Sequence, residues 1–187
     1  MHNIKKSIRK NIAFAAVMLM AVFTLAACGK KDDGGSFGFN NGSVLLTPGE
    51  KFSADDEGMP ETLKELKKRG IRLAVCSNKP HPAAVKVIAQ LYGDDFDMVL
   101  GQSDAIRRKP APDGPLMIAG KFGVRPEECM YVGDTSTDMK TGKAAGMFTV
   151  GALWGFRDRE ELNANGADLV AEHPTDLVKI SEEYCND

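Results

Sequence analysis

The chain has 187 residues, of which 43% are hydrophobic and 27% are charged, a composition typical of a globular protein. Its formal net charge of −2 excludes the strongly basic surface of a nucleic-acid-binding protein. The four cysteines are far apart and form no CxxC pair, so no disulfide framework is indicated. We therefore expect one domain with an extension, and no nucleic-acid partner.

The first 28 residues have the three parts of an export signal. A basic stretch over 5–10 precedes an apolar run over 12–27, which is shorter than the ~20 residues that a membrane-spanning helix needs. The run ends in "LAAC", which resembles the lipobox of bacterial lipoprotein precursors. That resemblance implies lipidation of Cys28, removal of the residues before it, and a membrane-anchored lipoprotein on the extracytoplasmic face. An uncleaved N-terminal anchor is the alternative.

Residues 29–57 are expected to form a flexible tether. Gly, Ser, Asn and Asp dominate this segment, as in mobile linkers. Asn41-Gly42 lies between short apolar runs and could close a small hairpin. The predicted organisation is therefore a signal peptide over 1–28, a tether over 29–57 and a folded core over 58–187.

From Gly58 onward, short apolar strands alternate with helices. Pro60 can begin a helix without wasting an amide hydrogen, and Gly70 can end it. In chain order we expect a helix over 60–70, a strand over 71–76, a helix over 83–92, a strand over 96–101, a helix over 114–122, a strand over 129–134, a helix over 137–145, a strand over 147–153, a helix over 159–163, a strand over 167–171, and a helix from Pro174. This alternation predicts an α/β protein with a parallel sheet covered on both faces.

Polar residues follow three apolar stretches, and right-handed crossovers would bring those loops to one edge of the sheet. They are Ser77-Asn78-Lys79, Lys109 in "RRKPAPDG", and the loop with Asp134 and Asp138. Hydroxyl and amide groups can cradle phosphate oxygens, a lysine can offset their charge, and carboxylates suit Mg²⁺. Taken singly, Ser77 reads as a turn residue, Lys109 as a solvated charge, and the aspartates as groups that favour the N-terminus of a helix.

In this order, however, the three loops resemble motifs of the haloacid dehalogenase-like phosphatases, closest to the phosphoglycolate phosphatase branch. The resemblance rests on "LAVCSNK", "KPAPDG" and "VGDTSTDM" as the second, third and fourth motifs, with "GALWGFRDREEL" as the loop after the fifth strand. It implies a three-layer α/β/α Rossmann-like core and a small phosphorylated metabolite as substrate. Ser77 and Asn78 would bind phosphate, Lys109 would stabilise its charge, and Asp134 and Asp138 would hold Mg²⁺.

The first motif of that family, D-x-D-x-[TV] at the end of the first strand, is not found. Its first aspartate is the nucleophile in the family. Asp95-Phe96-Asp97 fits the letters, but it precedes a strand instead of ending one. We therefore expect a core that lacks the first-motif strand and the cap domain, with Ser43 to Leu46 as a candidate for part of the gap.

Three interpretations remain open. The chain could be a Mg²⁺-dependent phosphatase whose missing segment comes from elsewhere, a membrane-anchored module that binds phosphate or Mg²⁺ without catalysis, or a truncated or fused gene product. A two-component receiver domain is excluded by order, because receivers place their lysine after the acidic pocket, whereas here Lys109 precedes Asp134.

Overall fold

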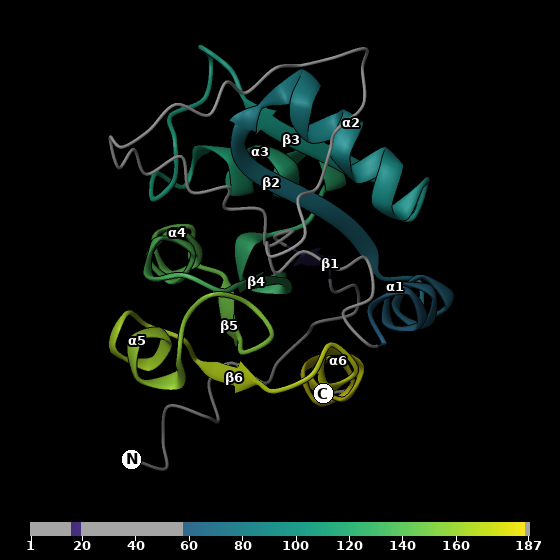
Figure 1. The fold of residues 1–187 in the computed structure, drawn as a ribbon, viewed down its shortest axis with the longest axis vertical. Coiled ribbons are helices and arrows are strands. Elements are labelled where there is room, and N and C mark those ends of the chain that lie inside the picture. The colour runs from purple at the N-terminus through teal and green to yellow at the C-terminus, as the bar shows by residue number, and fades with distance from the viewer. Residues whose placement is uncertain (1–15, 20–57, 186–187) are drawn as a thin grey trace, which may run out of the picture.

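The computed structural model describes residues 16–19 and 58–185 (Figure 1). Among these residues, six parallel strands form one sheet in the order β3-β2-β1-β4-β5-β6. The strands are β1 (Ala16–Leu19), β2 (Arg72–Pro80), β3 (Met98–Gln102), β4 (Cys129–Gly133), β5 (Phe148–Ala152) and β6 (Leu169–Ala171). The helices are α1 (Met59–Lys68), α2 (His81–Tyr92), α3 (Asp113–Phe122), the 3₁₀ turn η1 (Pro126–Glu128), α4 (Ser136–Ala144), α5 (Arg159–Ala164) and α6 (Asp176–Cys185).

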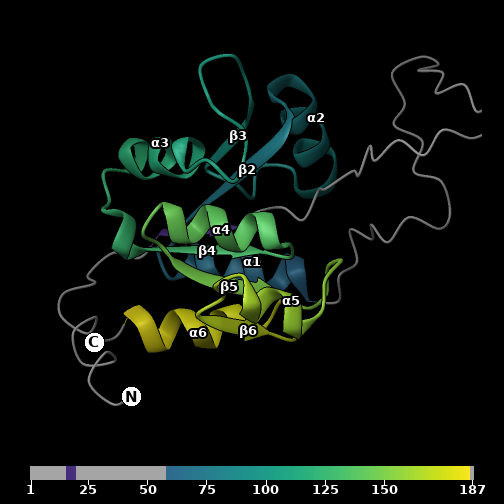
Figure 2. The same cartoon turned by 90° about the vertical axis from the view of Figure 1, so that its left-hand side faces the viewer.

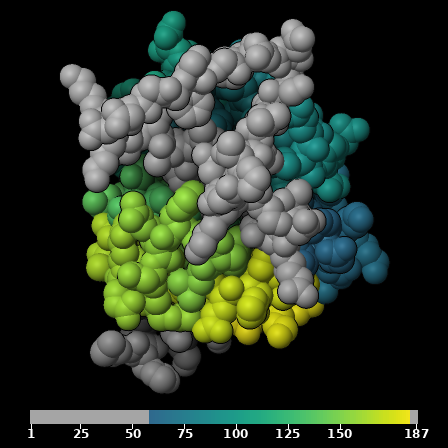
Figure 3. Space-filling model, viewed as in Figure 1, coloured from purple at the N-terminus to yellow at the C-terminus, as the bar shows by residue number. Residues whose placement is uncertain are grey.

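Helices cover both faces of the sheet, which confirms the predicted three-layer α/β/α fold. α1 and α6 pack on one face, where Leu63 and Leu177 join a buried cluster with Val132 of β4. α3 lies over the other face, where Ile118 meets Tyr131 in a second cluster. In the view turned by 90°, α4 lies in front of β4 (Figure 2). The space-filling view places α1, in blue, beside α6, in yellow, at the surface (Figure 3).

The helix ends follow local chemistry. Pro60 and Glu61 lie in the first turn of α1. Basic residues lie in its last turn, where their positive charge interacts favourably with the negative end of the helix dipole. Thr135 caps α4 by accepting a hydrogen bond from the backbone N–H of Asp138. Asp158 caps α5 in the same way. These caps fix where two of the site loops end.

Most element ends shift by one to three residues from the prediction, and two differences are larger. The segment 77–82, expected as a turn, instead completes β2 and begins α2 at His81. The strand continues because Pro80 pairs with Gln102 of β3 after a shift in register beyond Cys76. The 3₁₀ turn η1 was not predicted; Glu128 accepts from the backbone N–H of Arg125 there.

The expected gap in the sheet is filled, so the expectation of a core without its central strand needs correction. β1 lies between β2 and β4 and pairs with both in parallel. Ser43–Leu46, the candidate for part of this position, lies outside the described residues. The position belongs to Ala16–Leu19, from the apolar run over 12–27. A central strand pairs with backbone groups of β2 and β4 that would be costly to leave unpaired in the core, and an apolar segment suits that place.

Much of the N-terminal prediction lies outside the described residues. This holds for Cys28, for the Asn41-Gly42 hairpin and for nearly all of the expected signal peptide and tether. Within the described part of the chain, no helix combines the length and apolar character needed to cross a membrane.

Candidate phosphate and metal site

The predicted site residues meet at the carboxyl edge of the sheet. Ser77 lies near the end of β2, and Asp134 directly follows β4, on the other side of the central strand. Lys109 comes from the loop between β3 and α3, and its ammonium group reaches Asp138 in the first turn of α4. The parallel sheet therefore brings together residues that are far apart in the sequence.

Lys109 and Asp138 form a buried ion pair. Lys109 Nζ lies 2.7 Å from Oδ1 of Asp138, and the side chains are only 9% and 3% exposed. The other oxygen, Oδ2, accepts a hydrogen bond of 2.6 Å from the Thr135 hydroxyl. Gly133 must be glycine here, because an added Cβ would lie 2.3 Å from the Cβ of Asp138. Each oxygen of Asp138 therefore has one partner, the lysine for Oδ1 and the hydroxyl that caps its own helix for Oδ2.

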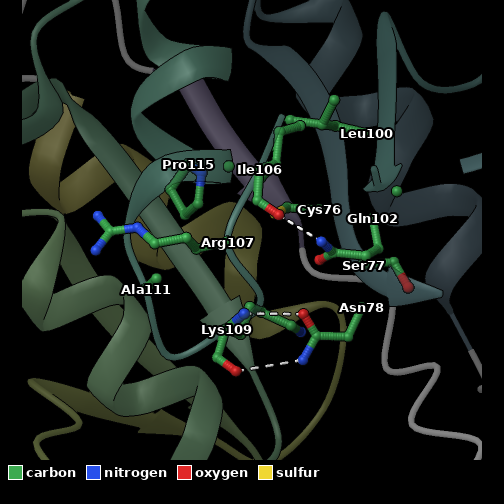
Figure 4. Close-up of a pocket in the computed structure, with 12 residues that line it drawn as sticks. Cys76, Ser77, Asn78, Leu100, Gln102, Ile106, Arg107, Lys109, Ala111 and Pro115 are labelled. Atoms are coloured by element: carbon green, nitrogen blue, oxygen red, sulfur yellow. Dashed lines mark hydrogen bonds between the residues drawn. The ribbon is translucent and has the colours of Figure 1, made fainter. Parts of the chain in front are cut away.

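Asn78 clamps the backbone of Lys109. Its Oδ1 accepts from the Lys109 backbone N–H at 2.9 Å, and its Nδ2 donates to the Lys109 carbonyl at 3.4 Å (Figure 4). This gives Asn78 a positioning role for the lysine loop. Its direct contact with phosphate stays a prediction.

Ser77 is buried, and its hydroxyl oxygen accepts from the backbone N–H of Lys79 at 3.1 Å. That bond uses a lone pair and leaves the hydroxyl hydrogen free to donate, so the residue can still serve a phosphate oxygen. Ser77 lies in β2 and not in the turn that its residue type alone suggested, and its hydroxyl supports the local backbone.

A small hollow lies beside this clamp. It is open to solvent and is lined by Ser77, Lys109, Gln102, Arg107 and apolar side chains (Figure 4). Asp134 and Asp138 do not line it. The hollow therefore adjoins the site without including its carboxylates.

Cys76 also lines the hollow, but its thiol is a poor candidate for a nucleophile. Burial raises the pKa of Cys76 to about 11, although the Lys109 charge opposes this shift. The thiol is therefore neutral near pH 7, and the thiolate is the reactive form. Burial likewise raises the pKa of Cys129 to about 12. Both cysteines are buried in the core.

Asp134 is the carboxylate with an available oxygen. It is 1% exposed; Oδ2 accepts from the backbone N–H of Phe156 at 2.9 Å, while Oδ1 is buried with no hydrogen-bond partner among the described residues. Burial raises the pKa of Asp134 to about 6, and the Phe156 N–H opposes this shift. A buried carboxylate oxygen without a partner is costly unless something else binds it.

The donor set fits a hard cation that takes one protein carboxylate. Mg²⁺ is often held by one or two carboxylates together with waters and substrate phosphate oxygens. Asp134 Oδ1 can supply such an oxygen without losing a hydrogen bond, whereas each oxygen of Asp138 already accepts one. In the described part of the chain, no three His, Cys, Asp or Glu side chains gather as a metal site. The predicted metal role of Asp138 therefore stays a prediction, and Asp134 is the better candidate ligand.

The Asp95-Phe96-Asp97 segment lies away from this site. Asp97 accepts from the Leu73 N–H at 2.7 Å, and its own N–H donates to the Leu73 carbonyl at 2.8 Å. Leu73 is near the start of β2, so Asp97 braces the opposite edge of the sheet from Ser77. This bears out the interpretation that the segment is not the nucleophile motif.

Two contributors were not predicted. Thr135 had a partial signal, because a threonine three residues before an acidic residue is typical of a helix N-terminus. The Phe156 amide had none, because a backbone donor leaves no mark on the residue type.

Comparison with known proteins places the chain in a family. A family profile for haloacid dehalogenase-like hydrolases matches residues 43–146, a range that begins inside the expected tether. The chain is 34% identical to a phosphoglycolate phosphatase from Pectobacterium atrosepticum, over 64% of this chain and 52% of that protein. It is 36% identical to a phosphoglycolate phosphatase from Aquifex aeolicus, over 67% of this chain and 58% of that protein.

Solved structures give the same relationship. A predicted phosphoglycolate phosphatase from Haemophilus somnus superposes with a TM-score of 0.61 at 31% identity, covering 67% of this chain and 56% of that one. A hydrolase from Pseudomonas syringae gives a TM-score of 0.61 at 29% identity, covering 68% and 59%. The chain spans about half the length of the curated relatives it matches. With a profile match over more than half of its residues, the chain belongs to the haloacid dehalogenase-like hydrolase family.

Proposed function

We propose that this chain binds a small phosphate monoester together with Mg²⁺ and does not hydrolyse it unaided. The observation that carries the proposal is Oδ1 of Asp134, a buried carboxylate oxygen with no partner among the described residues. The similarity to phosphoglycolate phosphatases supports a small phosphorylated ligand.

Different residues of the chain would bind the phosphate and the metal. The Ser77 hydroxyl can donate to a phosphate oxygen, and Lys109, held by Asp138 and by the Asn78 clamp, brings a positive charge to the same edge. Mg²⁺, when bound, would offset the charge on the phosphate oxygens. Asp134 would hold the cation through Oδ1.

Lack of turnover is proposed because no carboxylate follows the central strand. β1 ends at Leu19, and the next residues in the sequence are Met20, Ala21 and Val22. None of these three residues carries a carboxylate, and their apolar side chains cannot attack phosphorus.

Thermal unfolding tests the binding part. We expect Mg²⁺ with inorganic phosphate to raise the melting temperature of the chain, because a ligand that binds only the folded state stabilises it. Asp134→Asn should lose the response to Mg²⁺. An equal rise in both proteins would mean that Asp134 is not the metal ligand.

The leader supports a separate proposal about location. Its sequence favours lipidation at Cys28 and attachment on the extracytoplasmic side of a membrane. Processing at that point would also remove β1 from the sheet. The mass of the chain recovered from an expressing bacterium tests this proposal: a lipidated product that starts at Cys28 supports it, and an unmodified full-length chain contradicts it.

A further inference from the structure

We propose that the turn after β5, at Gly155 and Phe156, positions the Asp134 carboxylate and thereby sets the metal affinity of the site. The inference rests on the proposed function and deepens it. It assigns a positioning role to two residues that offer the metal no ligating side chain.

The first argument is a backbone hydrogen bond. The Phe156 N–H donates to Oδ2 of Asp134 at 2.9 Å, and Oδ1 stays without a partner among the described residues. A donor on one oxygen fixes the rotation of the carboxylate and leaves the other oxygen for the cation. Groups that hydrogen-bond to metal ligands commonly orient them in this way.

The second argument is the space beside Gly155. A Cβ added there would lie 2.3 Å from the Cβ of Asp134 and 2.5 Å from its Oδ2. Gly155 does not have the left-handed φ that favours glycine elsewhere, so the need for glycine is one of close approach. The backbone of the turn and the carboxylate therefore pack directly against each other.

The third argument is that the turn is anchored on both sides. The Leu153 N–H donates to the Ala171 carbonyl at 3.0 Å, and Trp154 packs against the buried cluster on the α1 face. After the turn, Asp158 accepts from the Glu161 N–H at 2.9 Å and begins α5. A turn held at both ends can impose a geometry on Asp134 instead of following it.

The side chain of Phe156 has a different environment from its amide. It is 44% exposed, whereas the Asp134 carboxylate that its N–H reaches is almost fully buried. The positioning role therefore belongs to the backbone, and substitutions can separate the two parts of the residue.

Four variants of the full chain test the proposal, with Mn²⁺ as the probe, water-proton relaxation as the readout and Mg²⁺ as competitor. Phe156→Pro removes the N–H, and Gly155→Ala inserts a methyl group against the carboxylate; each should weaken Mn²⁺ binding by about tenfold or more. Phe156→Ala keeps the N–H and should bind Mn²⁺ at least about fivefold more tightly than Phe156→Pro. Gly120→Ala is the matched control, because Gly120 lies in α3 with open space around its Cα. It should change binding by less than about twofold.

A second measurement uses the unsubstituted chain, so it still tests the proposal if the turn variants fail to fold. In a titration of the unsubstituted chain with Mg²⁺, the amide resonance of Phe156 should shift with the same dissociation constant as the Mn²⁺ competition gives, and Asp134→Asn should abolish the shift. Metal binding with an unmoved Phe156 resonance, or equal Mn²⁺ affinity in folded Phe156→Pro and Phe156→Ala, overturns this inference alone. An unsubstituted chain that binds no Mn²⁺ overturns the proposed function as well.

Discussion

Lys109 Nζ lies 2.7 Å from Oδ1 of Asp138, and both side chains are almost completely removed from solvent. The pair joins the loop before α3 to the first turn of α4, across segments separated by 29 residues. Its geometry means that the fold holds the Lys109 ammonium group, our proposed phosphate ligand, in place. It also means that neither charge can be removed alone without cost.

We expect Lys109→Met to lower the free energy of unfolding by about 3–5 kcal/mol, because it leaves Asp138 charged and uncompensated in the interior. The double variant Lys109→Met/Asp138→Asn should recover part of this loss, since no buried charge remains. Urea unfolding of the three proteins, followed by circular dichroism, measures both effects.

The matched control is the exposed pair Arg159–Glu172, which has the same separation of 2.7 Å. Arg159→Met should cost less than about 1 kcal/mol, because solvent screens surface ion pairs. Equal losses for the two Met variants would show that burial of Lys109 and Asp138 does not govern their interaction.

Asp134 should make the metal-free protein less stable as the pH rises. Burial raises the pKa of Asp134 from 3.8 to about 6, so the folded state keeps a proton that the unfolded state has lost between those values. Stability then falls with rising pH across that interval. Asp134→Asn should therefore be more stable than the parent by up to roughly 3 kcal/mol near pH 7.5 in EDTA, with little difference below about pH 4.

Asp113 provides a control of opposite sign. The Arg107 guanidinium beside it lowers the pKa of Asp113, so its ionised form stabilises the fold. Asp113→Asn should lose stability near pH 7.5, and the loss should shrink as the pH falls through the lowered pKa of Asp113. If Asp134→Asn also loses stability near pH 7.5, as expected for Asp113→Asn, then contacts other than those described stabilise the ionised Asp134 carboxylate.

The central strand gives a prediction about folding. Val17 pairs with Leu73 on one side and with Met130 on the other. Val17→Pro should lower the melting temperature of the full chain, because proline in a central strand removes a ladder hydrogen bond. In the same variant, the backbone amides of β2 and β4 should exchange with solvent faster than in the parent chain. An unchanged melting temperature would mean that β1 does not contribute to the stability of the sheet.

The sequence predicted the features that depend on local pattern. Short apolar runs such as 129–134 gave the strands, and Lys109 and Asp134 were expected at one edge because parallel strands share that edge. The sequence did not predict the strand at Ala16–Leu19. An apolar run after basic residues indicates an export signal, and the sequence pattern does not show that the same run can also pair with other strands. The Phe156 amide was missed because its role comes from backbone placement alone.

Phosphorus NMR tests the central claim most directly, with 2-phosphoglycolate, MgCl₂ and the full chain in one sample. We expect the phosphorus resonance of the ester to broaden or shift in the presence of Mg²⁺, this effect to be lost in Asp134→Asn, and no inorganic phosphate to accumulate. Release of inorganic phosphate that Asp134→Asn abolishes would contradict the account, because the chain would then possess the nucleophile that we find missing. An ester resonance that the protein leaves unchanged would contradict the binding site itself.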